Sequence, residues 1–229
     1  DADTCSCRMA ASASPLPATL PPAERYNPSL VPTLEAHVRA QCDHTVAYDV
    51  DANLALLKLY QLNPHLCDVL ITGKVLALAL MQLPATDYLL ATYLVPERVS
   101  EGELLAPLRE VANLLESCTF RQVWAALEPI RSTLLDAVPG FDAALREYML
   151  TTMQITYQAI PEAHLRASLG LSAEEVAALL AARGWTLEGG VVKVTLNQDN
   201  QAKPHKVDDR GLLRREQMSK ILSSIGASQ

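Results

Sequence analysis

The sequence predicts a mainly α-helical protein in which a stack of helical hairpins is followed by a winged helix and a separate C-terminal helix. Apolar residues recur at helical spacing from Tyr26 to about Tyr157, and proline-containing breakers divide this stretch into segments. After Pro161 the pattern changes to two short helical segments and then two β-prone runs around a Gly-Gly turn. A chain of 229 residues with 49% apolar residues can form such a core without disulfides or a metal.

The amino-terminal residues 1–23 are predicted to be a disordered leader. Residues 10–22 form an Ala/Ser/Pro/Leu tract without the periodicity that a packed element needs. Met9 is a candidate start of the native chain. The helical-repeat domain is expected over 24–158.

The helices of this domain are read from apolar residues at i, i+3, i+4 and i+7. Two sets follow this rule: Leu108, Val111, Ala112 and Leu115; and Phe120, Val123, Trp124 and Leu127. Leu30, Leu34 and Val38 share one helix face, and Phe141, Leu145, Tyr148, Thr152 and Ile155 continue the helical pattern. The stretch 49–62 is apolar on nearly all sides, which predicts a helix buried between neighbours, with Asp49 or Asp51 as its N-cap.

The winged-helix domain is expected over 159–196. A short helix from Glu162 ends at Gly170, and Ser172 with Glu175 forms a capping box for the next helix. The β-prone runs on either side of Gly189-Gly190 predict a hairpin, the wing. The remaining residues, 197–229, are predicted to be a linker and an amphipathic helix with Met218, Ile221, Leu222 and Ile225 on one face.

Charge limits the function classes. The chain has 19 Lys+Arg against 26 Asp+Glu, a net charge of −7, which disfavours a protein whose main task is to grip phosphate backbones. The acidity is uneven, because residues 190–229 carry a net +3 and the rest −10. Residues that could contact RNA or an acidic partner are Lys203, Lys206, Arg210, Arg214 and Arg215.

The alternative function is a nucleic-acid-binding winged-helix regulator. Its recognition helix, 172–183, should present Arg, Lys, Asn or Gln, but offers Glu174, Glu175 and alanines, with Arg183 alone at its end. Protein contact is therefore favoured. The predicted partner interface consists of Trp185, Val191, Val192, Val194, Met218, Ile221, Leu222 and Ile225.

No motif predicts catalysis, a cofactor, a metal or a small-molecule substrate. The segment Thr72-Gly73-Lys74-Val75 lacks the first glycine and the Ser/Thr of a phosphate-binding loop. Carboxylate pairs such as Asp49/Asp51 stand at expected helix starts, where they complement the helix dipole. Five cysteines without paired spacing indicate reduced thiols. With neither a membrane span nor a signal segment in the pattern, a cytoplasmic protein is expected.

Several long motifs resemble one family, subunit k of eukaryotic translation initiation factor 3. The segments that carry the resemblance are 25–28 (RYNP), 47–55 (AYDVDANLA), 57–64 (LKLYQLNP), 114–118 (LLESC), Phe120, 124–127 (WAAL), 155–158 (ITYQ), 184–185 (GW) and the serines of 223–229. The resemblance spans about 24–229, whereas the leader is not part of the family pattern.

The resemblance implies a PCI-type architecture, a HEAT-like helical-repeat domain followed by a winged helix, which the proteasome lid and the COP9 signalosome also use. It implies a non-catalytic scaffold subunit acting in translation initiation. Its expected partners are other subunits of the factor, chiefly subunit l, and through them the small ribosomal subunit. A scaffold subunit of one of the two related complexes is the further alternative.

Overall fold

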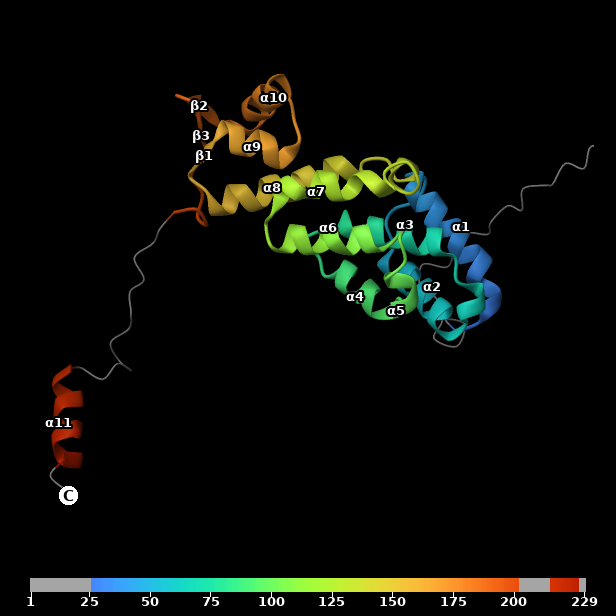
Figure 1. Ribbon diagram of the computed structural model, residues 1–229, viewed down its shortest axis with the longest axis horizontal. Coiled ribbons are helices and arrows are strands. Elements are labelled where there is room, and N and C mark those ends of the chain that lie inside the picture. The colour runs from blue at the N-terminus through green and yellow to red at the C-terminus, as the bar shows by residue number, and fades with distance from the viewer. Residues whose placement is uncertain (1–25, 202–214, 227–229) are drawn as a thin grey trace, which may run out of the picture.

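The computed structural model describes residues 26–201 and 215–226, with side chains of the last helix up to residue 223. The predicted leader, 1–23, lies outside the described residues. Figure 1 shows a helical part followed by a smaller part of helices and strands, and a last helix that follows residues drawn in grey. The predicted fold class is confirmed.

The helical part is built from eight α-helices and short 3-10 turns. Its α-helices are α1 (Val31–Cys42), α2 (Val50–Leu62), α3 (Val69–Leu80), α4 (Asp87–Leu94), α5 (Glu97–Ser100), α6 (Ala106–Glu116), α7 (Phe120–Leu127) and α8 (Phe141–Thr156). The 3-10 turns are η1 (Pro28–Leu30), η2 (Pro64–Leu66), η3 (Glu128–Ile130) and η4 (Leu135–Ala137).

The core of this part is organised around α3, which contacts α1, α2, α4, α6 and α8. Most of α3 is buried, and Gly73 lets a neighbour approach, since a Cβ there would lie 3.0 Å from the Leu134 side chain. The segment Thr72-Gly73-Lys74 is therefore interior helix, not a phosphate-binding loop. Helix α2, predicted to be buried between neighbours, is buried on one side only.

Helix α2 begins where the sequence indicates, because the Asp49 carboxylate accepts a hydrogen bond from the Ala52 backbone N–H at 3.1 Å. It contacts α1, α3 and α4 on its buried side. Its other face stays accessible, with Leu54 and Lys58 half-buried. Tyr48 donates a 3.0 Å hydrogen bond to Asp87 at the start of α4, which aligns the two helices.

The predicted apolar faces of α6 and α7 are confirmed: Leu108, Val111, Ala112, Leu115, Phe120, Val123 and Leu127 are buried. The face predicted for α8 is only partly right. Phe141 and Leu145 are buried, but the face continues through Met149 and Met153, and Ile155 is 47% exposed. The predicted face contained Tyr148 and Thr152, whereas the buried face contains Met149 and Met153, one residue further on. Because a helix advances by 100° per residue, this shift of one position rotates the face by that angle.

The smaller part has the winged-helix order. Its elements are β1 (Ala159–Pro161), α9 (Glu162–Leu169), α10 (Ala173–Arg183), β2 (Thr186–Glu188) and β3 (Val191–Lys193). Gly170, at φ +59°, ends α9, and the capping box of Ser172 and Glu175 starts α10. Both turn glycines, Gly189 and Gly190, have positive φ, as a tight hairpin requires.

Three cysteines lie in the described ranges, and all are free thiols: Cys42 is buried, Cys67 half-buried and Cys118 exposed. Burial raises the pKa of the Cys42 thiol, which keeps it neutral. No helix between residues 26 and 201, or in 215–226, has the length and apolar character to cross a bilayer.

Candidate protein-interaction site

The wing belongs to a three-stranded antiparallel sheet in the order β1-β3-β2. Ile160 of β1 and Leu187 of β2 both pair with Val192 of β3. Strand β3 is thus central, and β1 and β2 are the edges. The sequence predicted the hairpin but not β1, which is three residues long, ends in proline and pairs with a strand about 30 residues away.

Three of the predicted interface residues belong to the core of the winged helix. Trp185 is 4% exposed, Val192 0% and Val194 4%. Since side chains alternate across a strand, Val192 and Val194 share the inward face, and the sheet closes over them. They cannot contact a partner in this fold, so their predicted interface role is corrected.

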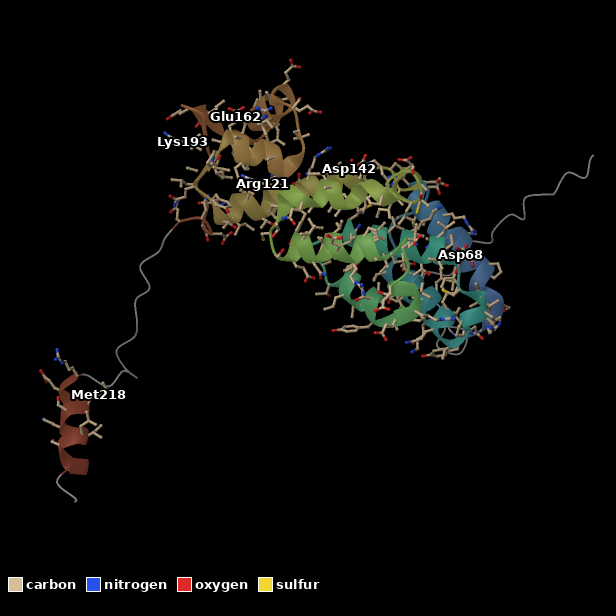
Figure 2. All side chains as sticks on the ribbon, viewed as in Figure 1. Asp68, Arg121, Asp142, Glu162, Lys193 and Met218 are labelled. Carbon is tan, nitrogen blue, oxygen red and sulfur yellow. The ribbon has the colours of Figure 1, made fainter. Side chains whose placement is uncertain are left out.

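Val191 alone of the wing valines stays accessible, at 37%. It pairs with Pro161 on one side and Glu188 on the other, on the outward face of the sheet. Lys193 on the same face forms an ion pair with Glu188 across the hairpin. Figure 2 shows Lys193 and Glu162 at the outer side of this part. The outward face is thus small, partly apolar and held by one exposed ion pair.

The turn that fixes the end of the wing is a second feature that the sequence pattern does not predict. Asn200 is 7% exposed, and its side-chain NH₂ donates to the carbonyl oxygens of Gln154, Tyr157 and Thr195. The Asn197 amide donates to Gln154 as well, at 3.0 Å. Residues 197–200 therefore cap the end of α8, where the sequence predicted the start of a linker.

Helix α11 (Arg215–Gly226) carries the second half of the predicted interface. Met218 is 50% exposed, Ile221 45% and Leu222 68%. Met218 and Leu222 are four residues apart and so lie on one face of the helix. Ile225 is within α11, but its side chain lies outside the described residues. Figure 2 shows Met218 on this helix.

The structure locates one of the five basic residues assigned to RNA or an acidic partner. Arg215 is exposed at the first residue of α11. Lys203, Lys206, Arg210 and Arg214 lie outside the described residues.

Helix α10 occupies the position of a recognition helix but lacks its chemistry. Its accessible residues are acidic or alanine, and its one basic residue, Arg183, pairs with Glu147 and donates to Gln154 at 3.3 Å. Base edges and phosphates are read by donors that are free to reach them. The geometry therefore agrees with the sequence in favouring protein contact.

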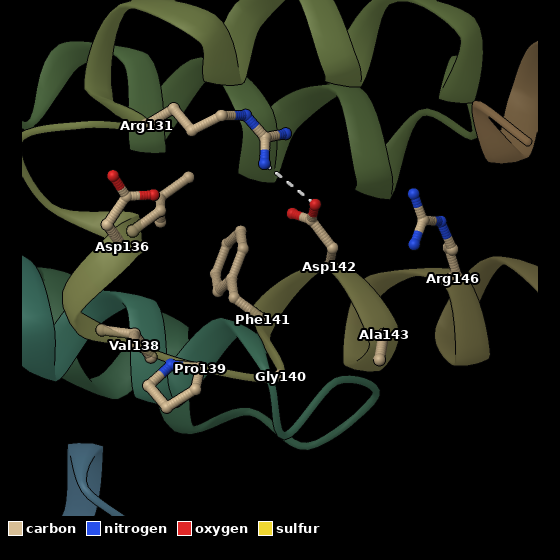
Figure 3. A pocket seen from close by; sticks show the side chains of 10 residues that line it. Arg131, Asp136, Val138, Pro139, Gly140, Phe141, Asp142, Ala143 and Arg146 are labelled. Carbon is tan, nitrogen blue, oxygen red and sulfur yellow. Dashed lines mark hydrogen bonds and ion pairs between the residues drawn. The ribbon is translucent and has the colours of Figure 1, made fainter.

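A surface pocket lies beside the start of α8 (Figure 3). It has a volume of about 370 Å³, and an ion pair between Arg131 and Asp142, with 2.9 Å between Nη1 and Oδ2, spans it. The hydrogen bond to Asp142 raises the pKa of Arg131. Arg146 beside it donates to the Leu169 carbonyl oxygen at 3.1 Å. These polar groups are satisfied by one another and by the backbone, which makes the pocket structural.

Within the described portion of the chain, no group of three His, Cys, Asp or Glu side chains is placed to hold a metal ion. His37 and Asp49 form a pair of candidate ligand groups, with 3.7 Å between Nε2 and Oδ2. Two groups do not make a metal site.

Comparison with known proteins gives a consistent family. The family model described as CSN8/PSMD8/EIF3K family matches residues 67–206. Eukaryotic translation initiation factor 3 subunit K of Xenopus laevis is 35% identical over 189 residues, which cover 82% of this chain and 85% of the relative. The proteins of the same name from Homo sapiens and Anopheles gambiae are 32% and 34% identical to this chain. The matched residues cover 82% and 83% of this chain and 85% and 86% of those relatives.

Proposed function

The chain belongs to the eukaryotic translation initiation factor 3 subunit K family, and on this premise we propose that it serves as a non-catalytic scaffold subunit of that factor. Its relatives are named as initiation-factor subunits, which supports this proposal. It acts in translation initiation, in the cytoplasm, through protein–protein contacts.

The observation that carries the scaffold mechanism is the apolar face of α11. A 12-residue helix that leaves Met218 and Leu222 at least half exposed has apolar surface to bury. Burial of apolar area is the main source of association free energy, about 25 cal/mol per Å². We assign this face to a bundle of helices from neighbouring subunits, chiefly subunit l, which in turn connects the chain to the small ribosomal subunit.

The outward face of the sheet is the second contact in the proposal. Val191 and Pro161 supply the apolar part, and the edge strand β2, whose three residues are all accessible, supplies unpaired backbone groups. Arg215 and the basic residues before it favour an acidic subunit surface or RNA as a weaker neighbour.

The test is co-purification of the factor's other subunits with tagged variants expressed in cells. Met218→Glu combined with Leu222→Glu should lower recovery of subunit l and of the other subunits at least tenfold, because each change places a charge on the apolar face. Ser223→Glu is the matched control. The Ser223 hydroxyl is polar and already donates to the Lys220 carbonyl oxygen of its own helix, at 2.9 Å, so it does not belong to the apolar face. Undiminished recovery with the double variant would contradict the role of α11.

The same co-purification separates the related complexes, and a binding assay separates the nucleic-acid-binding regulator. Enrichment of proteasome-lid or COP9-signalosome subunits in place of initiation-factor subunits would favour a related complex. A nucleic-acid-binding regulator would show binding to short RNA or DNA duplexes with a steep salt dependence that Arg214→Ala and Arg215→Ala remove. The acidic face of α10 argues against this outcome.

A further inference from the structure

A groove with no role in the proposed scaffold contacts lies between α2 and α4. It has a volume of about 250 Å³ and is lined by Tyr26, Asp51, Leu54, Ala55, Lys58 and Leu94. Four of these residues are at i, i+3, i+4 and i+7 of α2 and therefore form one helix face. This is the face that the rest of the helical part leaves uncovered.

The groove is a formed feature with apolar walls. Its two helices are held side by side by their contacts and by the Tyr48–Asp87 hydrogen bond of 3.0 Å. Leu54 and Leu94 are only half-buried, and Tyr26 at one side is 59% exposed. Tyr93, next to Leu94, is 71% exposed. An occupant would bury aromatic and aliphatic surface here.

The chain itself leads into this groove. Tyr26 is the first residue that the structure describes, and it is also a wall of the groove, so the segment that precedes it starts there. That segment reads SPLPATLPPAER over 14–25, with four prolines and two leucines. Proline-rich sequences favour an extended polyproline II conformation, and grooves lined by aromatic and aliphatic residues recognise it.

Charge supports the same occupant. The segment 14–25 ends in Glu24-Arg25, and the groove carries one residue of each sign, Lys58 and Asp51. We propose that residues 14–25 of this chain occupy the α2–α4 groove, with Leu20 and the prolines that follow it, Pro21 and Pro22, against Leu54 and Leu94. This segment then covers the open face of α2 in an extended conformation.

The tether makes this docking feasible at modest intrinsic affinity. From Leu20 to Arg25 the chain spans about 15 Å at about 3.1 Å per residue, enough to lie along the groove. A short tether also raises the effective concentration of the segment to the millimolar range. Even a contact of low intrinsic affinity is then formed in most molecules.

The test is photo-crosslinking in the full-length chain. Leu20 is replaced by p-benzoylphenylalanine, the protein is irradiated, and cross-linked tryptic peptides are identified by mass spectrometry. The expected partners are peptides 40–58 and 75–98, which contain Leu54 and Leu94. Leu54→Ser should lower the yield at least fivefold, while Leu187→Ser, which makes the same change at an exposed leucine on β2, should leave it unchanged.

Two further observations keep the proposal falsifiable. Circular dichroism checks that Leu54→Ser retains the helical content, and p-benzoylphenylalanine at Ser12 should give a lower yield on the same peptides. Mixing ¹⁵N-labelled with unlabelled protein separates cross-links within a chain from those between chains. Cross-links between chains, cross-links elsewhere on the protein, or a yield insensitive to Leu54→Ser would each overturn the assignment.

Discussion

The indole N–H of Trp124 donates a 2.9 Å hydrogen bond to the carbonyl oxygen of Ser168, which joins α7 of the helical part to the end of α9 in the winged helix. The guanidinium of Arg146 lies over the same indole, 4.8 Å from the ring centroid, and donates to the next carbonyl, Leu169. Two carbonyls that α9 leaves free at its C-terminus are thus satisfied from the helical part. This junction fixes where the winged helix presents its outward face.

Trp124→Phe should destabilise the fold by about 1–2 kcal/mol, because it leaves the Ser168 carbonyl without its donor while keeping most of the ring. Trp185→Phe is a comparison in which no hydrogen bond is lost, because the Trp185 indole N–H has no hydrogen-bond partner within the described residues. Its cost comes from the packing of a buried ring, since Trp185 is 4% exposed. Urea unfolding followed by far-ultraviolet circular dichroism measures both variants. A loss well below about 1 kcal/mol for Trp124→Phe would contradict the importance of the junction.

Gly170→Ala should lower the free energy of unfolding more than Gly184→Ala. Both glycines end an α-helix in the left-handed backbone conformation, with φ of +59° and +66°. Each alanine incurs the left-handed penalty of about 1–2 kcal/mol. At Gly170 the new Cβ would also lie 3.1 Å from Trp124 Nε1, whereas nothing lies within 4 Å at Gly184. The difference between the two free energies of unfolding therefore measures the contact with the ring. Equal losses of stability in the two variants would show that the Trp124 ring moves aside without an energetic cost.

Local signals in the sequence predict much of this fold, and non-local ones do not. The capping box at Ser172, the stop at Gly170 and the Gly-Gly turn each depend on a few adjacent residues, and all are found where predicted. Strand β1 and the turn of Asn200 depend on partners far along the chain, which no local pattern encodes.

The candidate site was predicted less well for a related reason. An apolar residue after a turn fits an interface and a core equally well, so Trp185 and Val192 were assigned to a partner although they close the winged helix. Only the pairing of β3 with both neighbours decides which face is inward. For α11, by contrast, helical spacing alone placed Met218 and Leu222 on one face, and their side chains are accessible as an interface requires.

Asn200→Ala should destabilise the winged helix by about 2 kcal/mol or more, since it deletes donors to buried carbonyls of α8 and the acceptor for the Asn197 backbone N–H, at 2.8 Å. Asp199→Ala, at the exposed neighbouring position, should change little. Hydrogen exchange should show faster exchange at the end of α8 in Asn200→Ala. Truncations meant to remove α11 should accordingly end after Gln201, and a cut before Asn200 should lower stability as the substitution does.

The stability that the capping box of α10 contributes should depend on pH in the acid range, because Glu175 titrates there. Hydrogen bonds from the backbone and side chain of Ser172 lower the pKa of the Glu175 carboxyl. The folded state thus favours the ionised form, so its stabilisation is complete above the unfolded-state pKa of about 4.3 and is lost as the pH falls through the lowered folded-state pKa.

Glu175→Gln can still accept the Ser172 backbone N–H but cannot titrate. Its stability should therefore fall less steeply than that of the wild type below pH about 4.3, whereas Glu174→Gln, outside the capping box, should follow the wild-type slope. Urea midpoints measured from neutral to acid pH would test this, and parallel curves for wild type and Glu175→Gln would show that the carboxylate adds nothing to the cap.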